Sequence, residues 1–222
     1  MSHQKARVLI VGRSPAALLD AVKSLRAKGY AADATNQFGQ VLTDYDVREL
    51  DLLVFGGMIP LDQKQYLRSE IGRRNAQLRT IEGLAGIAGV IVAQVEAETS
   101  TDTPTASVAY DRDRGVITLG LTEPAHVVAQ AWFGVFVPPV PTSSSLDLID
   151  ADLPAGSHAI DISVRASFAT VSVGSQVNVL TIAGVPKATA KLVPTTTRDQ
   201  RLPDVAAVTT HDGELSTGSA DV

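Results

Sequence analysis

Three short glycine-bearing segments hold the residues best placed to bind a ligand. They are Gly12-Arg13-Ser14, Gly56-Gly57-Met58 and Glu82-Gly83-Leu84, and each follows a short run with apolar residues. If these runs are parallel strands, the three segments share the carboxyl edge of one sheet, where α/β proteins bind ligands. The predicted ligand-binding residues are Gly12, Arg13, Ser14, Gly56, Gly57 and Gly83.

An anionic small molecule is the ligand that this edge would suit. Arg13 would supply a positive charge, and a helix beginning after Ser14 would supply free N–H groups. The other interpretation is that the glycines only allow the chain to turn.

A dinucleotide site is the weaker interpretation of the same edge. Asp33 lies 21 residues after Gly12, near the place of a ribose-binding acid. However, Arg, Ser, Pro, Ala and Ala follow Gly12, so the G-x-G-x-x-G run is absent.

Other catalytic and metal-binding patterns are missing from the sequence. It has no Cys, its four histidines are far apart, and neither G-x-S-x-G nor S-x-x-K occurs. Asp147, Asp150 and Asp152 cluster without the spacing or glycine of an EF-hand, which favours a solvated strand end over a calcium site. We therefore expect no catalytic residue, no metal and no cofactor.

The elements that position these residues follow a βαβ pattern over the first hundred residues. Apolar runs predict strands at 7–12, 31–34, 52–55 and 77–81. Ser14-Pro15 predicts a helix start and Gly29 its end; a weak helix follows at 38–45. A third helix opens at Pro60, with Leu61, Leu67 and Ile71 on one side and Lys64, Arg68, Arg73 and Arg74 on the other. Residues 87–98 fit a helix or a fifth strand, and the Ala and Glu content favours the helix.

The second half of the chain differs from the first in composition and in the periodicity of its apolar residues. Residues 99–105 form a polar linker, and short strands with turns fill 106–185, which predicts an antiparallel β-sandwich, or secondly a barrel. Trp132 lies in one of these strands and is expected in the core rather than in an exposed patch. Residues 186–222 are predicted to be a disordered tail because no hydrophobic period is sustained there.

The order of elements in residues 5–98 resembles the response regulator receiver domain, a flavodoxin-like α/β fold. In that family an acidic pair follows the first strand, a phospho-accepting Asp ends the third, a Ser or Thr ends the fourth, and a Lys ends the fifth. Here Gly12-Arg13, Gly56-Gly57 and Glu82-Gly83 stand at the first three of these places. The resemblance thus implies a receiver-like domain, residues 1–98, that cannot carry out phosphotransfer.

Charge and hydropathy limit the classes of partner that we expect the protein to bind. The net charge of −5 argues against a general nucleic-acid binder, and no apolar stretch suits a signal peptide or a membrane span. We expect a cytoplasmic, non-catalytic interaction or regulatory protein whose partner is another protein or a second copy of itself. The alternative is a sensor or enzyme that binds an anionic small molecule at the glycine-lined edge.

Overall fold

The structure, a computed structural model, describes residues 5–56, 58–84, 86–135, 142–162, 165–183 and 205–211. The chain divides into two compact units. The first runs to Val92 and includes the segment from Val205, and the second spans Ala93 to Asp204.

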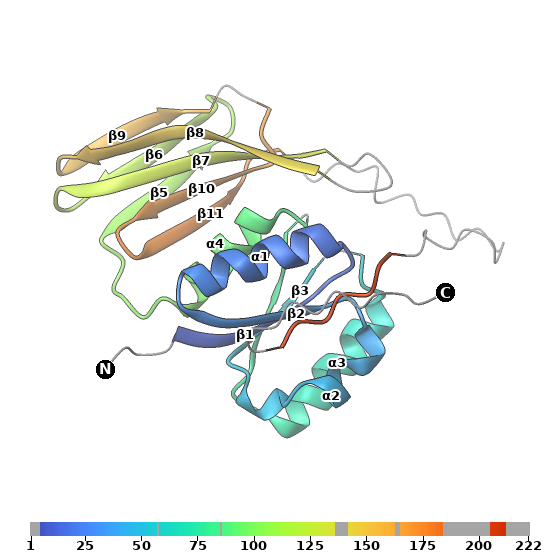
Figure 1. Cartoon of the computed structure of the whole chain (residues 1–222). Coiled ribbons are helices and arrows are strands. Elements are labelled where there is room, and N and C mark those ends of the chain that lie inside the picture. Colours follow the sequence, from blue (N-terminus) through green and yellow to red (C-terminus); the bar gives the residue numbers. More distant parts are fainter. Residues whose placement is uncertain are drawn as a thin grey trace. The chain divides into compact units, whose positions relative to one another are not determined.

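The first unit is built on a four-stranded parallel sheet with the order β2-β1-β3-β4 (Figure 1). The strands are β1 (Lys5–Val11), β2 (Tyr30–Thr35), β3 (Leu52–Phe55) and β4 (Arg79–Glu82). This parallel order is consistent with a flavodoxin-like fold, as expected.

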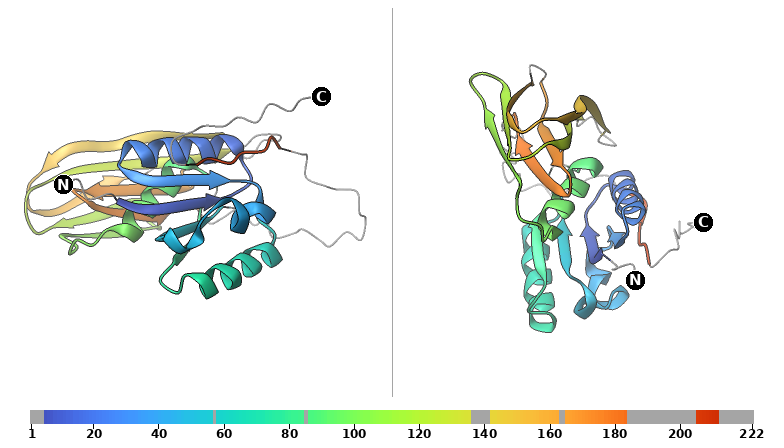
Figure 2. Two further views of the ribbon diagram at one scale, coloured as in Figure 1. Left: turned by 60° about the horizontal axis from the view of Figure 1, so that its bottom comes forward. Right: turned by 90° about the vertical axis from the view of Figure 1, so that its left-hand side faces the viewer.

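The helices of the first unit cover both faces of its sheet. Helix α1 (Pro15–Ala27) lies on one face, and α2 (Val41–Asp44) and α3 (Leu61–Arg74) lie on the other (Figures 1 and 2). All four residues of β3 are fully buried, as a strand covered on both faces requires. Short 3-10 turns at Phe38–Gln40 and Val47–Glu49 flank α2, where the sequence predicts one weak helix.

The predicted limits of α1 are confirmed. Pro15 is its first residue, Leu18, Val22 and Leu25 are buried, and Gly29 follows its end with φ +87°. Residues in the ambiguous stretch 87–98 belong to helix α4 (Ala88–Thr99) rather than to a fifth strand.

The predicted apolar side of α3 is only partly right. Leu67 and Ile71 are fully buried, but Leu61 in the first turn is 67% exposed. The helix begins one residue after Pro60, so Leu61 precedes the part of the helix that packs on the sheet.

The prediction of a disordered tail is wrong for residues 205–211, whereas 186–204 and 212–222 lie outside the described residues. Residues 205–211 lie along the outer edge of β2, where Thr35 and Thr209 form an antiparallel bridge (Figure 1). The backbone N–H of Asn36 donates to Val208 O at 3.0 Å, and that of Thr210 donates to Ala34 O at 3.0 Å. Val208 and Thr210 are buried, so this part of the tail belongs to the first unit.

The second unit contains two antiparallel sheets. One has the order β11-β10-β7-β8 and the other β5-β6-β9. Their strands are β5 (Ala106–Asp111), β6 (Val116–Leu121), β7 (Ala125–Val135), β8 (Thr142–Leu153), β9 (Gly156–Asp161), β10 (Phe168–Val173) and β11 (Gln176–Thr181). The hairpin of β5 and β6 turns at Gly115, whose φ is +64°.

One apolar cluster in the second unit takes residues from both of its sheets. Ile117 and Leu119 of β6 are fully buried in the same cluster as Val127 and Ala129 of β7. Trp132 is half-buried, and its indole N–H donates to Thr170 Oγ1 at 2.9 Å. Hydrogen bonding thus accompanies burial at the only tryptophan of the sequence.

Candidate functional site

The structure brings three of the predicted glycines together at the carboxyl ends of the parallel strands. The backbone N–H groups continue the strand pairing: Gly12 donates to Thr35 O, Gly56 to Val11 O and Gly83 to Phe55 O. A Cβ at Gly56 would lie 3.1 Å from Gly12 Cα, and one at Gly83 would lie 3.5 Å from Gly56 Cα. We call these three residues the glycine row.

The glycine row is required by close packing rather than by turn geometry. None of the three has a positive φ. A Cβ at Gly12 would meet Leu18 Cδ2 at 3.2 Å, and one at Gly83 would meet Val54 Cγ1 at 3.2 Å. The missing side chains are therefore replaced by protein atoms, not by an open cradle.

Ser14 lies beside the row, directly before α1. Its Oγ is buried and makes no hydrogen bond within the described part of the chain, and it does not cap the helix. A serine at the N-cap position of a helix normally accepts a hydrogen bond from a backbone N–H of the first turn. Arg13 is half-buried at the same edge. Gly57 lies outside the described residues, and Met58 after it is 46% exposed with φ 66°.

Charged side chains cluster at the end of β4. The sequence predicted only a basic face on α3 there. Glu82 accepts from Lys64 Nζ at 2.5 Å and from Arg68 at 2.6 Å, and the Arg68 guanidinium lies 5.1 Å from the Phe55 ring centroid. Burial by itself would raise the pKa of Glu82, but the hydrogen bonds and charges of Lys64 and Arg68 outweigh it and lower this pKa. Part of the basic face of α3 is thus neutralised within the protein.

The outer edge of β2 carries a polar network that no local sequence pattern predicts. Asp33 Oδ1 accepts from Arg26 at 2.6 Å and from Thr210 Oγ1 at 3.0 Å, so its carboxylate is engaged by protein and does not match a ribose-binding acid. The Tyr45 hydroxyl lies 2.9 Å from Thr210 O. Burial, followed by the charge of Asp33, raises the pKa of Tyr45, which keeps the hydroxyl protonated as a donor.

The aspartates of β8 contact neighbouring strand residues rather than forming a metal site. Asp147 accepts from Gln130 at 2.8 Å, and His126 lies between Asp150 and Asp152, with ring nitrogens 3.0 and 2.9 Å from their carboxylates. Among the described residues, no group of three or more His, Cys, Asp or Glu side chains could hold a metal ion.

The stability of the second unit should depend on the protonation of His126. The hydrogen bond that the His126 ring donates to Asp152, helped by the charges of Asp152 and Asp150, raises the pKa of His126 above 6.5. A raised pKa means that the stabilisation is fully present below pH 6.5 and is lost as the pH rises through the folded-state value. Thermal unfolding should therefore show that His126→Gln lowers Tm at pH 5.5 and loses this effect at pH 9.

The matched control for this prediction is His158→Gln, because the His158 ring contacts Pro154 O at 2.8 Å rather than a carboxylate. A Tm difference for His126→Gln that is the same at both pH values would contradict the proposed charge interaction.

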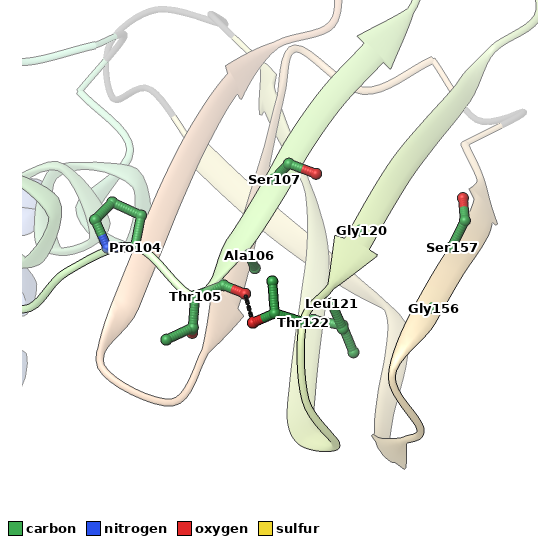
Figure 3. A pocket seen from close by; sticks show the side chains of 9 residues that line it. All are labelled: Pro104, Thr105, Ala106, Ser107, Gly120, Leu121, Thr122, Gly156 and Ser157. Atoms are coloured by element: carbon green, nitrogen blue, oxygen red, sulfur yellow. Dashed lines mark hydrogen bonds between the residues drawn. The ribbon is translucent and has the colours of Figure 1, made fainter.

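An open groove of about 470 Å³ lies on the sheet of β5, β6 and β9 (Figure 3). Thr105, Ser107, Thr122 and Ser157 are among the residues that line it, and Thr122 Oγ1 donates to Thr105 O at 3.0 Å. A Cβ at Gly120 would lie 2.5 Å from Ser107 Oγ, so glycine leaves space for that hydroxyl. None of the described residues that line the groove has an ionisable side chain.

Comparisons with known proteins do not assign a family. No family model and no curated protein matches the chain. Among solved structures, a glutamine amidotransferase from Thermotoga maritima aligns with 16% identity over 79% of this chain and 74% of its own, with a TM-score of 0.28. A TM-score this low supports neither a fold nor an activity. In the described part of the chain, no helix has the length and apolar character needed to span a membrane.

Proposed function

We propose that the protein is a non-catalytic interaction or regulatory protein, built from a receiver-like domain without a phospho-acceptor and from a β-sandwich. The glycine row carries this proposal. In a receiver domain the same strand ends hold the carboxylates and the acceptor Asp, whereas here a Cβ at Gly56 would meet neighbouring backbone at 3.1 and 3.2 Å. The edge is packed with backbone where phosphotransfer needs side chains.

The second unit supports the same proposal. Its two antiparallel sheets contribute to one buried apolar cluster, as the two layers of a sandwich would. The described residues that line the groove on its three-stranded sheet have no ionisable side chain. Such a unit is better suited to binding than to proton transfer.

The proposal predicts that acetyl phosphate with Mg²⁺ will leave the intact mass of the protein unchanged, because Gly56-Gly57 stand where the acceptor Asp would be. A receiver domain with an intact acceptor serves as the positive control under the same conditions. A stoichiometric gain of one phosphoryl group that hydroxylamine removes would contradict the proposal.

Binding of an anionic small molecule at the carboxyl edge is the second candidate function. The buried, unbonded Ser14 Oγ before the 13-residue helix α1 is the observation that favours it. A thermal-shift screen of nucleotides, sugar phosphates and carboxylates would find such a ligand, since a ligand at 100 times its Kd adds about 2.7 kcal/mol of stability.

For a ligand found in this way, Arg13→Ala is expected to weaken binding by roughly 10- to 150-fold, the cost of one charge-assisted hydrogen bond. Lys23→Ala is the matched control, because it removes one exposed positive charge from α1 away from the edge. Equal affinity of both variants would place the ligand elsewhere.

A further inference from the structure

We propose that the outer edge of β2 is a strand-docking site, which residues 205–211 occupy within the chain and which an extended segment of a partner protein can take in their place. The proposal rests on the interaction role proposed above. It adds the place of binding and the chemistry of the partner.

Recognition at this edge uses side chains as well as the backbone. The Ala34 N–H donates to Thr210 Oγ1 at 2.8 Å, so a hydroxyl takes the place of a main-chain acceptor. Asn36 accepts from the Val208 N–H at 2.9 Å and donates to Ala206 O at 2.7 Å. An edge that contacts its partner strand through side chains binds particular sequences, whereas an ordinary sheet edge pairs with any extended chain.

These contacts define the partner's chemistry. Thr210 is 1% exposed and gives its hydroxyl to Asp33, so this position requires Thr or Ser and excludes an acidic or phosphorylated residue. Val208 is 8% exposed, so the position two residues earlier requires a small apolar side chain. We therefore infer an extended Val-x-Thr-like segment that pairs antiparallel to β2.

The segment holds its place through few buried groups, which makes exchange feasible. Val208 and Thr210 are buried, whereas Val205, Ala206, Ala207 and His211 are exposed. Elements with little buried surface open at low free-energy cost. A partner must still compete with a segment on the same chain, which lowers its apparent affinity for the closed protein.

The test is binding of a fluorescent peptide of residues 205–211 to three full-length chains, measured by fluorescence anisotropy. Thr210→Asp places a carboxylate against Asp33 and should release the chain's own segment. Ala207→Asp adds the same charge at an exposed position as the control. We expect the peptide to bind the Thr210→Asp chain at least 10-fold more tightly than the wild-type or Ala207→Asp chain, and a peptide with the same Thr210→Asp change not to bind.

Amide hydrogen exchange at Asn36, whose N–H bonds Val208 O, reports release of the segment. Faster exchange in the Thr210→Asp chain without peptide binding would overturn the proposal, as would unchanged exchange. If the Thr210→Asp chain does not fold, the Thr210→Val chain is used instead, because valine removes the hydroxyl and has a similar size. If the wild-type chain is a dimer and excess peptide converts it to a monomer, the edge binds a second copy of this chain. That result would overturn the proposal of a different partner protein. None of these results bears on phosphorylation, so this inference and the proposed function fail separately.

Discussion

Gly56→Ala is expected to destabilise the protein by about 1–3 kcal/mol, the usual cost of forcing atoms into a packed interior. The new methyl carbon would lie 3.1 Å from Gly12 Cα and 3.2 Å from Val11 O. Both neighbours are backbone atoms of the central sheet, so they cannot move aside as a flexible side chain would. Urea unfolding of the full chain measures the change.

The matched control is Gly72→Ala in α3, where an added Cβ would meet nothing within 4 Å. This change should stabilise the protein by about 0.5–1 kcal/mol, because alanine loses less backbone entropy in a helix. If both substitutions changed stability in the same direction, the glycine row would not be a packing requirement.

Asp33→Ala is expected to destabilise the first unit by about 2–3 kcal/mol, because it removes a carboxylate that accepts two hydrogen bonds. Asp33 contacts Arg26 at 2.6 Å, and the two side chains are 14% and 24% exposed. Loss of the carboxylate leaves a largely desolvated guanidinium without its ionic partner and frees the Thr210 hydroxyl. Chemical unfolding gives the loss directly.

Glu49→Ala provides the comparison for Asp33→Ala. Glu49 also accepts from an arginine, Arg7, at 2.6 Å, but its side chain is 60% exposed. Exposed pairs contribute about 0–1 kcal/mol. Similar losses in the two variants would show that burial does not determine the strength of these pairs.

Much of the first unit could be predicted because its signals are local. Pro15 and Gly29 define a helix through backbone conformation, and residues 52–55 are apolar on both faces of a covered strand. The meeting of Gly12, Gly56 and Gly83 also followed from parallel topology, which brings strand ends to one edge. The close packing at these glycines was not predicted, because contacts between distant backbone segments cannot be read from single residues.

The C-terminal segment could not be predicted because its partner is distant in the sequence. Thr209 meets Thr35 across 174 residues. The β-branched run Val208-Thr209-Thr210 favours a strand, but the polar stretch also holds the β-branched run Thr195-Thr196-Thr197, so this local pattern does not single out the docked segment. Pairing specificity comes from Asn36 and Asp33, whose engagement depends on tertiary structure.

Residues 205–211 form part of the first unit's sheet edge, and we propose that Thr210 secures them there. Amide hydrogen exchange of the full chain tests this most directly at Thr210 and Asn36, whose N–H groups bond Ala34 O and Val208 O. We predict that both amides exchange more slowly in the wild-type chain than in an unstructured peptide, and that both exchange faster after Thr210→Asp. Exchange of the wild-type Thr210 amide at the rate of an unstructured peptide would contradict the account.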